Sequence, residues 1–207
     1  FQVFPADNPW NWDVSGHAVH PNSAKFVESI GADKKLHCDF GTEWKGQPNG
    51  IPFVIVGGKQ KKVPVAFEYA EESDPGPYPI PDDAPIEGGA ASDGDRHILV
   101  IDRDNHLLYE LFKCTKSATG WKAGSGAIFN LDSNDLRREG WTSADAAGLP
   151  IYPGLVRYDE VAKGAIAHAL RFTIVKSQKA YIYPARHHAS SDRDPNRPPM
   201  GLRLRLK

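Results

Sequence analysis

Two short stretches of the chain place a histidine two residues away from a carboxylate. His37 and Asp39 form one pair, and Asp95 and His97 form the other. Residues two apart share a face of an extended strand. Asp95 and His97 could therefore act as general acid and base or supply metal ligands, and Asp39 could fix the tautomer of His37 and raise its basicity. The alternative in both places is a turn. Residues 36–41 would form a turn that follows the first helix, and residues 93–97 would form a turn built from Asp and Gly.

Glu110 is expected on the apolar face of a strand, in line with Leu108 and Phe112. A buried carboxyl group is costly unless it is paired, and burial raises its pKa. A raised pKa is what the general acid of a glycosidase needs. A slip of one residue in the strand register would instead turn Glu110 to the opposite face.

A further group of polar side chains follows a loop rich in glycine and proline. Arg157, Tyr158 and Glu160 stand close together there, and His168 and Arg171 come next. An enzyme that cleaves uronic-acid polymers by β-elimination needs a cation for the carboxylate and a Tyr or His to move the proton. Arg157 or Arg171 with Tyr158 and His168 would supply these groups, and Glu160 is a further candidate acid or base.

Three stretches near the end of the chain alternate apolar and polar residues. They predict strands at 167–175, 180–183 and 202–206. In one sheet, their outer face would carry Arg171, Arg203, Arg205 and one or both of Tyr181 and Tyr183. Guanidinium forks bind oxygens and flat rings stack on sugar faces, so this surface would bind a sugar polymer. The alternative is an ordinary solvated sheet face.

Histidines could also hold a metal ion. His37, His97 and His168 form the candidate ligand set of a metal-dependent oxidative enzyme. His187 and His188 are adjacent, so in a strand they would point apart, and a surface loop is the simpler interpretation. The chain has no CxxC, HExxH, phosphate-binding loop or GxSxG motif. We therefore assign no metal site and leave the cofactor open.

Short strands are the elements that must position these residues. The chain has 19 glycines and 17 prolines between short apolar stretches, which is typical of all-β folds. The expected elements are a helix at 24–30, hairpins from 50–58 with 62–69 and from 96–102 with 106–112, a strand at 126–131, and helical turns at 143–147 and 158–163. The predicted fold is an all-β, two-sheet sandwich of jelly-roll type with long Pro- and Gly-rich loops.

The whole chain, 1–207, is predicted to form one domain. Residues 1–22, which include a stretch rich in Trp and Pro, form an N-terminal arm packed on it. Residues 71–92 contain five prolines, which excludes a helix or a central strand. We expect this segment to run extended over the surface.

Charge and hydropathy exclude two classes of partner. The net charge of -1 gives no general attraction to nucleic acid or to an acidic membrane. No apolar run approaches the ~18 residues of a membrane span. The chain starts at Phe1 without a Met, which predicts a mature secreted protein, or a trimmed one.

The two cysteines, Cys38 and Cys114, leave two possibilities open. An oxidising compartment favours a disulfide, which would stabilise the fold by roughly 4 kcal/mol through closure of a long loop. The alternative is two unrelated buried thiols.

Several stretches together resemble a family of poorly characterised secreted proteins of soil bacteria, often joined to carbohydrate-binding or other extracellular modules. The resemblance lies in residues 36–41, 79–81, 85–89, 94–97, 140–150, 154–161 and 166–172. It implies an extracellular location and a chain that continues beyond Lys207, but it names no catalytic residue. Cys38 stands where the family pattern leads us to expect proline, which favours a bridge to Cys114.

The sequence therefore predicts an extracellular protein that acts on a polysaccharide, by hydrolysis or β-elimination. A non-catalytic carbohydrate-binding module and the metal-dependent oxidative enzyme are the alternatives. The sequence leaves the polymer and the oligomeric state open.

Overall fold

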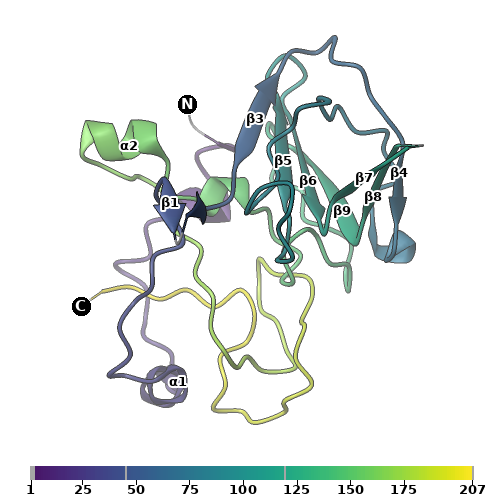
Figure 1. Cartoon of the computed structure of the whole chain (residues 1–207). Coiled ribbons are helices and arrows are strands. Elements are labelled where there is room, and N and C mark those ends of the chain that lie inside the picture. Colours follow the sequence, from purple (N-terminus) through teal and green to yellow (C-terminus); the bar gives the residue numbers. More distant parts are fainter. Residues whose placement is uncertain (1–2, 45, 119, 207) are drawn as a thin grey trace.

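The structure, a computed structural model, describes residues 3–44, 46–118 and 120–206. Within these residues, most of the regular structure is strand, arranged in a four-stranded and a three-stranded sheet, with a small two-stranded ribbon and short helices (Figure 1). The prediction of strands in two sheets with a few short helices is confirmed. The N-terminal arm and the C-terminal segment lie together beside the sheets.

The four-stranded sheet has the order β3-β5-β6-β9. Its strands are β3 (Phe53–Val56), β5 (Ile98–Asp102), β6 (Leu107–Phe112) and β9 (Ser125–Asn130). β5 and β6 form the predicted antiparallel hairpin, with Val100 opposite Tyr109. The predicted strand at 126–131 is present as β9, which pairs antiparallel with β6.

The three-stranded sheet has the order β4-β8-β7, from β4 (Val65–Phe67), β8 (Gly120–Ala123) and β7 (Thr115–Ser117). The two-stranded ribbon joins β1 (Glu43–Trp44) to β2 (Gln47–Pro48). The predicted hairpin of 50–58 with 62–69 is wrong, because β3 pairs parallel with β5 and β4 pairs parallel with β8. All of β5 is buried, so it needs a partner on each edge, and this requirement overrides the local turn signal.

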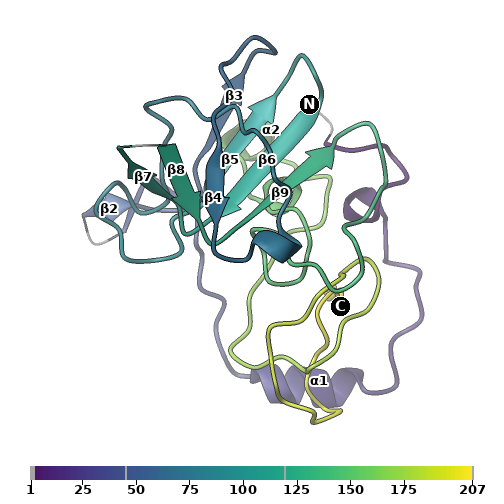
Figure 2. The same cartoon turned by 90° about the vertical axis from the view of Figure 1, so that its right-hand side faces the viewer.

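Both faces of the four-stranded sheet are covered over β5 and β6, and the sheet therefore divides the core into two parts. On one face, Leu99 and Leu108 pack with the N-terminal arm and with Ile151 of a later loop. On the other face, Val100 packs with Trp121 of the three-stranded sheet. Figure 2 shows this sheet towards one of its faces, with the C-terminal segment below it.

The helices are short. They are α1 (Ser23–Ile30), α2 (Tyr158–Lys163) and the 3-10 turns η1 (Pro9–Asn11), η2 (Ala70–Glu72) and η3 (Tyr152–Gly154). α1 confirms the predicted helix, buries Phe26 and ends at Gly31. α2 confirms the predicted helical turn at 158–163, whereas 143–147 forms irregular turns and no helix.

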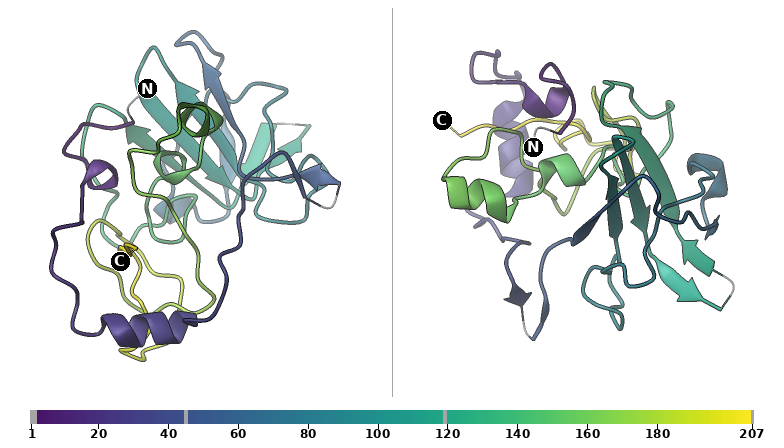
Figure 3. Two further views of the ribbon diagram at one scale, coloured as in Figure 1. Left: turned by 90° about the vertical axis from the view of Figure 1, so that its left-hand side faces the viewer. Right: turned by 90° about the horizontal axis from the view of Figure 1, so that it is seen from above.

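The predicted strands at 167–175, 180–183 and 202–206 are wrong. In the described chain these segments are irregular, apart from one isolated bridge between Tyr181 and Met200. Their backbone groups pair elsewhere: Ala169 N–H donates to the Trp10 carbonyl, and Arg171 N–H donates to the Gly154 carbonyl. Figure 3 shows the C-terminal loops beside α1, where Arg197 donates to Ser29.

The proline-rich segment 71–92 is irregular, as expected, apart from two residues of η2 at its start and an isolated bridge at Tyr78. Its centre does not lie on the surface. Tyr78, Pro79 and Ile80 are buried against the sheets, and Tyr78 exchanges backbone hydrogen bonds with Val63. The segment therefore closes part of the core, because its apolar residues have nowhere else to be buried.

Cys38 and Cys114 are both free thiols. Cys38 is exposed in the segment between α1 and β1, whereas Cys114 is buried in the core. The disulfide that the sequence left open, and that the family resemblance favoured, is absent from the structure.

Candidate functional site

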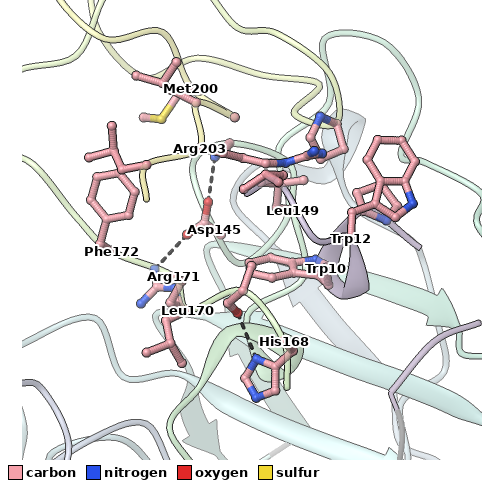
Figure 4. Close-up of a pocket in the computed structure, with 18 of the residues that line it drawn as sticks. Trp10, Trp12, Asp145, Leu149, His168, Leu170, Arg171, Phe172, Met200 and Arg203 are labelled. Atoms are coloured by element: carbon pink, nitrogen blue, oxygen red, sulfur yellow. Dashed lines mark hydrogen bonds and ion pairs between the residues drawn. The ribbon is translucent and has the colours of Figure 1, made fainter. Parts of the chain in front are cut away.

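A pocket of about 650 Å³ lies between the N-terminal arm and the second half of the chain (Figure 4). The arm contributes residues 9–14, a loop contributes 145–147 with 149–150, and the C-terminal segments contribute 166–174 and 198–204. None of these stretches belongs to a sheet. The pocket is therefore built from the 3-10 turn η1 and from irregular segments, outside the sheets.

Two tryptophans of the arm line the pocket. Trp10 packs tightly on Gly154, where an added Cβ would come within 2.6 Å of the indole ring. Only glycine allows the ring this close approach. Trp12 is 39% exposed and stacks on the Tyr183 ring at 5.9 Å. The Arg203 guanidinium also lies over the Trp12 ring, 4.9 Å from its centre.

Asp145 and Arg171 form the polar pair of the pocket. The Arg171 guanidinium donates to the Asp145 carboxylate at 2.7 Å, and the Ala147 N–H donates to the same carboxylate at 2.9 Å (Figure 4). The Ser143 hydroxyl accepts from the Asp145 N–H. Both partners are partly exposed. The loop and the C-terminal segment therefore meet through one oriented ion pair.

Glu160, Arg157 and His168 form a second cluster beside the pocket. The Arg157 guanidinium donates to Glu160 at 2.6 Å, and His168 Nε2 lies 3.1 Å from the other Glu160 oxygen. His168 Nδ1 lies 2.8 Å from the Ala169 carbonyl. The side chains of Arg157 and His168 are each only 7% exposed. Both histidine nitrogens thus already face acceptors.

His97 is buried in the core and does not line the pocket. Its Nδ1 donates to Glu87 at 2.6 Å, and its Nε2 lies 3.1 Å from the Ala144 carbonyl. Burial lowers the pKa of His97, but the hydrogen bond to Glu87 and that carboxylate's charge outweigh burial, so the net pKa is raised. His97 thereby ties the loop at 144 to the sheet.

Glu110 is fully buried, as its place on the apolar face of the strand predicted. Its carboxylate accepts from the N–H groups of Ile151 and Tyr152. Burial raises the pKa of Glu110 to about 7, although these two hydrogen bonds lower it. Glu110 does not line the pocket and instead anchors the loop that contributes Asp145.

The remaining candidate acids and bases lie apart from the pocket lining. His37 and Asp39 come together at 3.4 Å, but both side chains are largely exposed between α1 and β1. Asp95 is exposed, and its backbone carbonyl accepts from Lys113. Tyr158 is exposed on α2. The catalytic roles expected for these residues stay predictions.

Tyr181 belongs to a separate cluster with Glu139, Arg186 and His188. Its hydroxyl donates to Glu139, which also pairs with Arg186 at 2.8 Å. The Tyr181 ring stacks on His188, and His188 stacks on His187. Of the expected sugar-binding residues, Arg171 and Arg203 line the pocket and Tyr183 contacts Trp12 there, whereas Tyr181 and Arg157 are engaged in other contacts.

The described residues contain no group of three or more His, Cys, Asp or Glu side chains arranged to hold a metal ion. Likewise, none of the helices in the described ranges has the length and apolar character needed to cross a bilayer.

Three lining residues were missed by the sequence interpretation: Trp10, Trp12 and Asp145. The density of Trp and Pro at 9–12 marked a packed arm but gave no sign of the surface it faces. Asp145 stood in the predicted helical turn at 143–147, but only the long-range contact with Arg171 gives it a role.

No protein-family model, curated protein or solved structure matches this chain.

Proposed function

We propose that this chain is an extracellular protein that binds a polysaccharide in the pocket between its N-terminal arm and C-terminal segments. The observation that carries the proposal is the lining itself. Trp10 and Trp12 lie in one concavity with the Asp145–Arg171 pair. Apolar walls with a few oriented polar groups are typical of ligand sites, and aromatic rings combine a broad apolar face with low entropy cost.

The size of the pocket is compatible with a sugar ring and its neighbours. Its volume of about 650 Å³ falls within the usual range of small-molecule sites, roughly 300–1,000 Å³. The jelly-roll variant of the sandwich and the secreted location belong to the same proposal.

Binding without cleavage is the version that the contacts favour. General acid–base chemistry needs a histidine nitrogen or a carboxyl group that can reach the substrate. The nitrogens of His97 and His168 already face oxygens of other residues. Glu160 is occupied by Arg157 and His168.

Cleavage is the second candidate, because one observation favours it. His168 and Arg171 both line the pocket, with Glu160 behind His168. A proton-transfer group and a cation therefore border the same space. A substrate that displaced the Glu160–His168 contact would leave the imidazole available to it.

Affinity gel electrophoresis with a panel of neutral and acidic polysaccharides tests the proposal. At least one polymer should retard the protein, and Trp12→Ala should weaken binding about tenfold, because a buried ring contributes roughly 1.5–3 kcal/mol when fully covered. Tyr183→Ala, which changes an exposed ring that stacks on Trp12, should weaken it in the same direction.

The matched control is Tyr69→Ala, an exposed aromatic residue outside the pocket lining. It should bind like the unaltered chain. Equal retardation of the Trp12→Ala and Tyr183→Ala variants and the unaltered chain, or retardation by no polymer, would contradict the proposal. New reducing ends or unsaturated products during the same incubation would decide for cleavage over binding alone.

A further inference from the structure

Arg203 is the charged side chain of the pocket for which the described part of the chain offers no partner of opposite charge. Among the described residues it makes no ion pair and no hydrogen bond, and its guanidinium rests on the Trp12 ring. Burial lowers the pKa of Arg203 from its usual value. Because arginine stays protonated in proteins, the group keeps its full positive charge in a partly dry place.

The other charges that line the pocket are already balanced. Asp145 and Arg171 neutralise each other at 2.7 Å. His168 is held against Glu160. Asp13 accepts from the Ser15 N–H at the outer end of the arm, where it also lies near the positive charge of Arg205.

A partly desolvated guanidinium is costly unless it meets an anion. The planar fork of arginine matches a carboxylate, which it binds through two parallel hydrogen bonds. The cation–π contact with Trp12 restrains the Arg203 guanidinium before any ligand arrives. Such preorganisation reduces the entropy cost of binding.

We propose that Arg203 recognises the carboxylate of an acidic sugar, so that the polymer bound by this pocket is a polyuronate. This inference rests on the proposed function, which concerns polysaccharides in general. The sugar ring packs on the apolar lining, which includes Trp10, Leu170 and Phe172, while its carboxylate meets Arg203. The Asp145–Arg171 pair then offers an acceptor and a donor to ring hydroxyls.

Calorimetric titration with matched ligands tests this inference. The ligands are oligomers of galacturonate, mannuronate and glucuronate, each compared with its methyl ester, which keeps the ring and removes the charge. At least one acid should bind about 10- to 100-fold more tightly than its ester, because hydrogen bonds to charged groups contribute strongly. Added salt should weaken the binding of the acid and leave the binding of the ester unchanged.

The Arg203→Gln variant should lose this preference, and Arg203→Lys, which keeps the charge without the fork, should retain part of it. Arg103→Gln removes the same charge from an exposed position outside the pocket lining and should bind like the unaltered chain. Thermal unfolding of each variant shows whether the fold is kept. If Arg203→Gln does not fold, the Arg203→Lys variant and the comparison of acids with esters still test whether Arg203 recognises the carboxylate.

Two outcomes overturn the inference and leave the proposed function intact: acids and esters bind equally, or none of these oligomers binds while a neutral polysaccharide retards the protein. Retardation by no polysaccharide at all overturns both proposals. Binding of dodecanoate in place of the uronates would identify the pocket as a site for an amphiphilic acid and would also overturn both.

Discussion

Replacing Glu110 by glutamine should raise the stability of the fold at pH 8 and flatten its dependence on pH. The carboxylate is fully buried, and its pKa rises from 4.5 to about 7 on folding. Because the folded state holds the proton more tightly, protonation stabilises it. Stability therefore increases as the pH falls from 8 through 7 towards 4.5.

The magnitude follows from this difference in pKa. Between pH 8 and pH 5 the gain is about 2 to 3 kcal/mol. For a domain of this size that raises the melting temperature by roughly 4 to 12 °C. His97 adds in the same direction, since its raised pKa stabilises the fold as the pH falls towards 6.5. The lowered pKa of Glu87 affects stability only below about pH 4.5, where protonation of its carboxylate destabilises the fold.

Urea unfolding, followed by tryptophan fluorescence from pH 5 to pH 8, measures the effect. Glu110→Gln mimics the protonated side chain, so it should be about 1 to 3 kcal/mol more stable than the unaltered chain at pH 8. Its free energy of unfolding should keep only the smaller dependence on pH that His97 supplies. Glu28→Gln, a change on the exposed face of α1, should keep the full slope. A Glu110→Gln variant with the full slope, or with lower stability at pH 8, would refute the reasoning.

Two further predictions concern buried groups. A thiol reagent should modify the exposed Cys38 of the native chain quickly. It should modify Cys114 only on unfolding, because Cys114 is buried and its pKa is raised to about 12. Two quickly modified thiols, or none, would contradict the structure. Arg137→Met should destabilise the fold by about 3 to 5 kcal/mol in urea unfolding, because it leaves Asp74 without its ion pair. The exposed Arg103→Met is its control, and a loss below about 1 kcal/mol for Arg137→Met would show that the pair is dispensable.

The sequence predicted those elements whose signal is local. The hairpin of β5 and β6 follows from two apolar runs around a polar turn, and α1 follows from Ser23 before an apolar face and Gly31 after it. The burial of Glu110 followed from strand alternation alone. In each case neighbouring residues determine the outcome, so no distant contact was needed.

Pairing with distant strands could not be predicted in this way. The turn at Gly57 and Gly58 suggested a hairpin, but β3 and β4 join different sheets. Alternation along 167–175 indicated which side chains share a face, yet it does not tell whether a strand lies alongside. Here the N–H groups of Ala169 and Arg171 donate to carbonyls of the 3-10 turns η1 and η3 instead of a neighbouring strand.

The candidate site was predicted only in part for the same reason. Arg171, Arg203 and His168 were chosen for their chemistry, and all three line the pocket. Trp12 and Asp145 come from segments far away in the chain, and only the folded structure brings them to the others. Their residue types alone did not distinguish them from a packed arm and a turn.

The most direct measurement is an NMR titration that follows the indole N–H signals of the chain, assigned by Trp→Phe variants, during addition of a retarding polysaccharide fragment. The account predicts that the signals of Trp10 and Trp12 move with the ligand while that of Trp121, buried beneath the other face of the sheet, stays in place. Movement of Trp121 with Trp10 and Trp12 unchanged would contradict it.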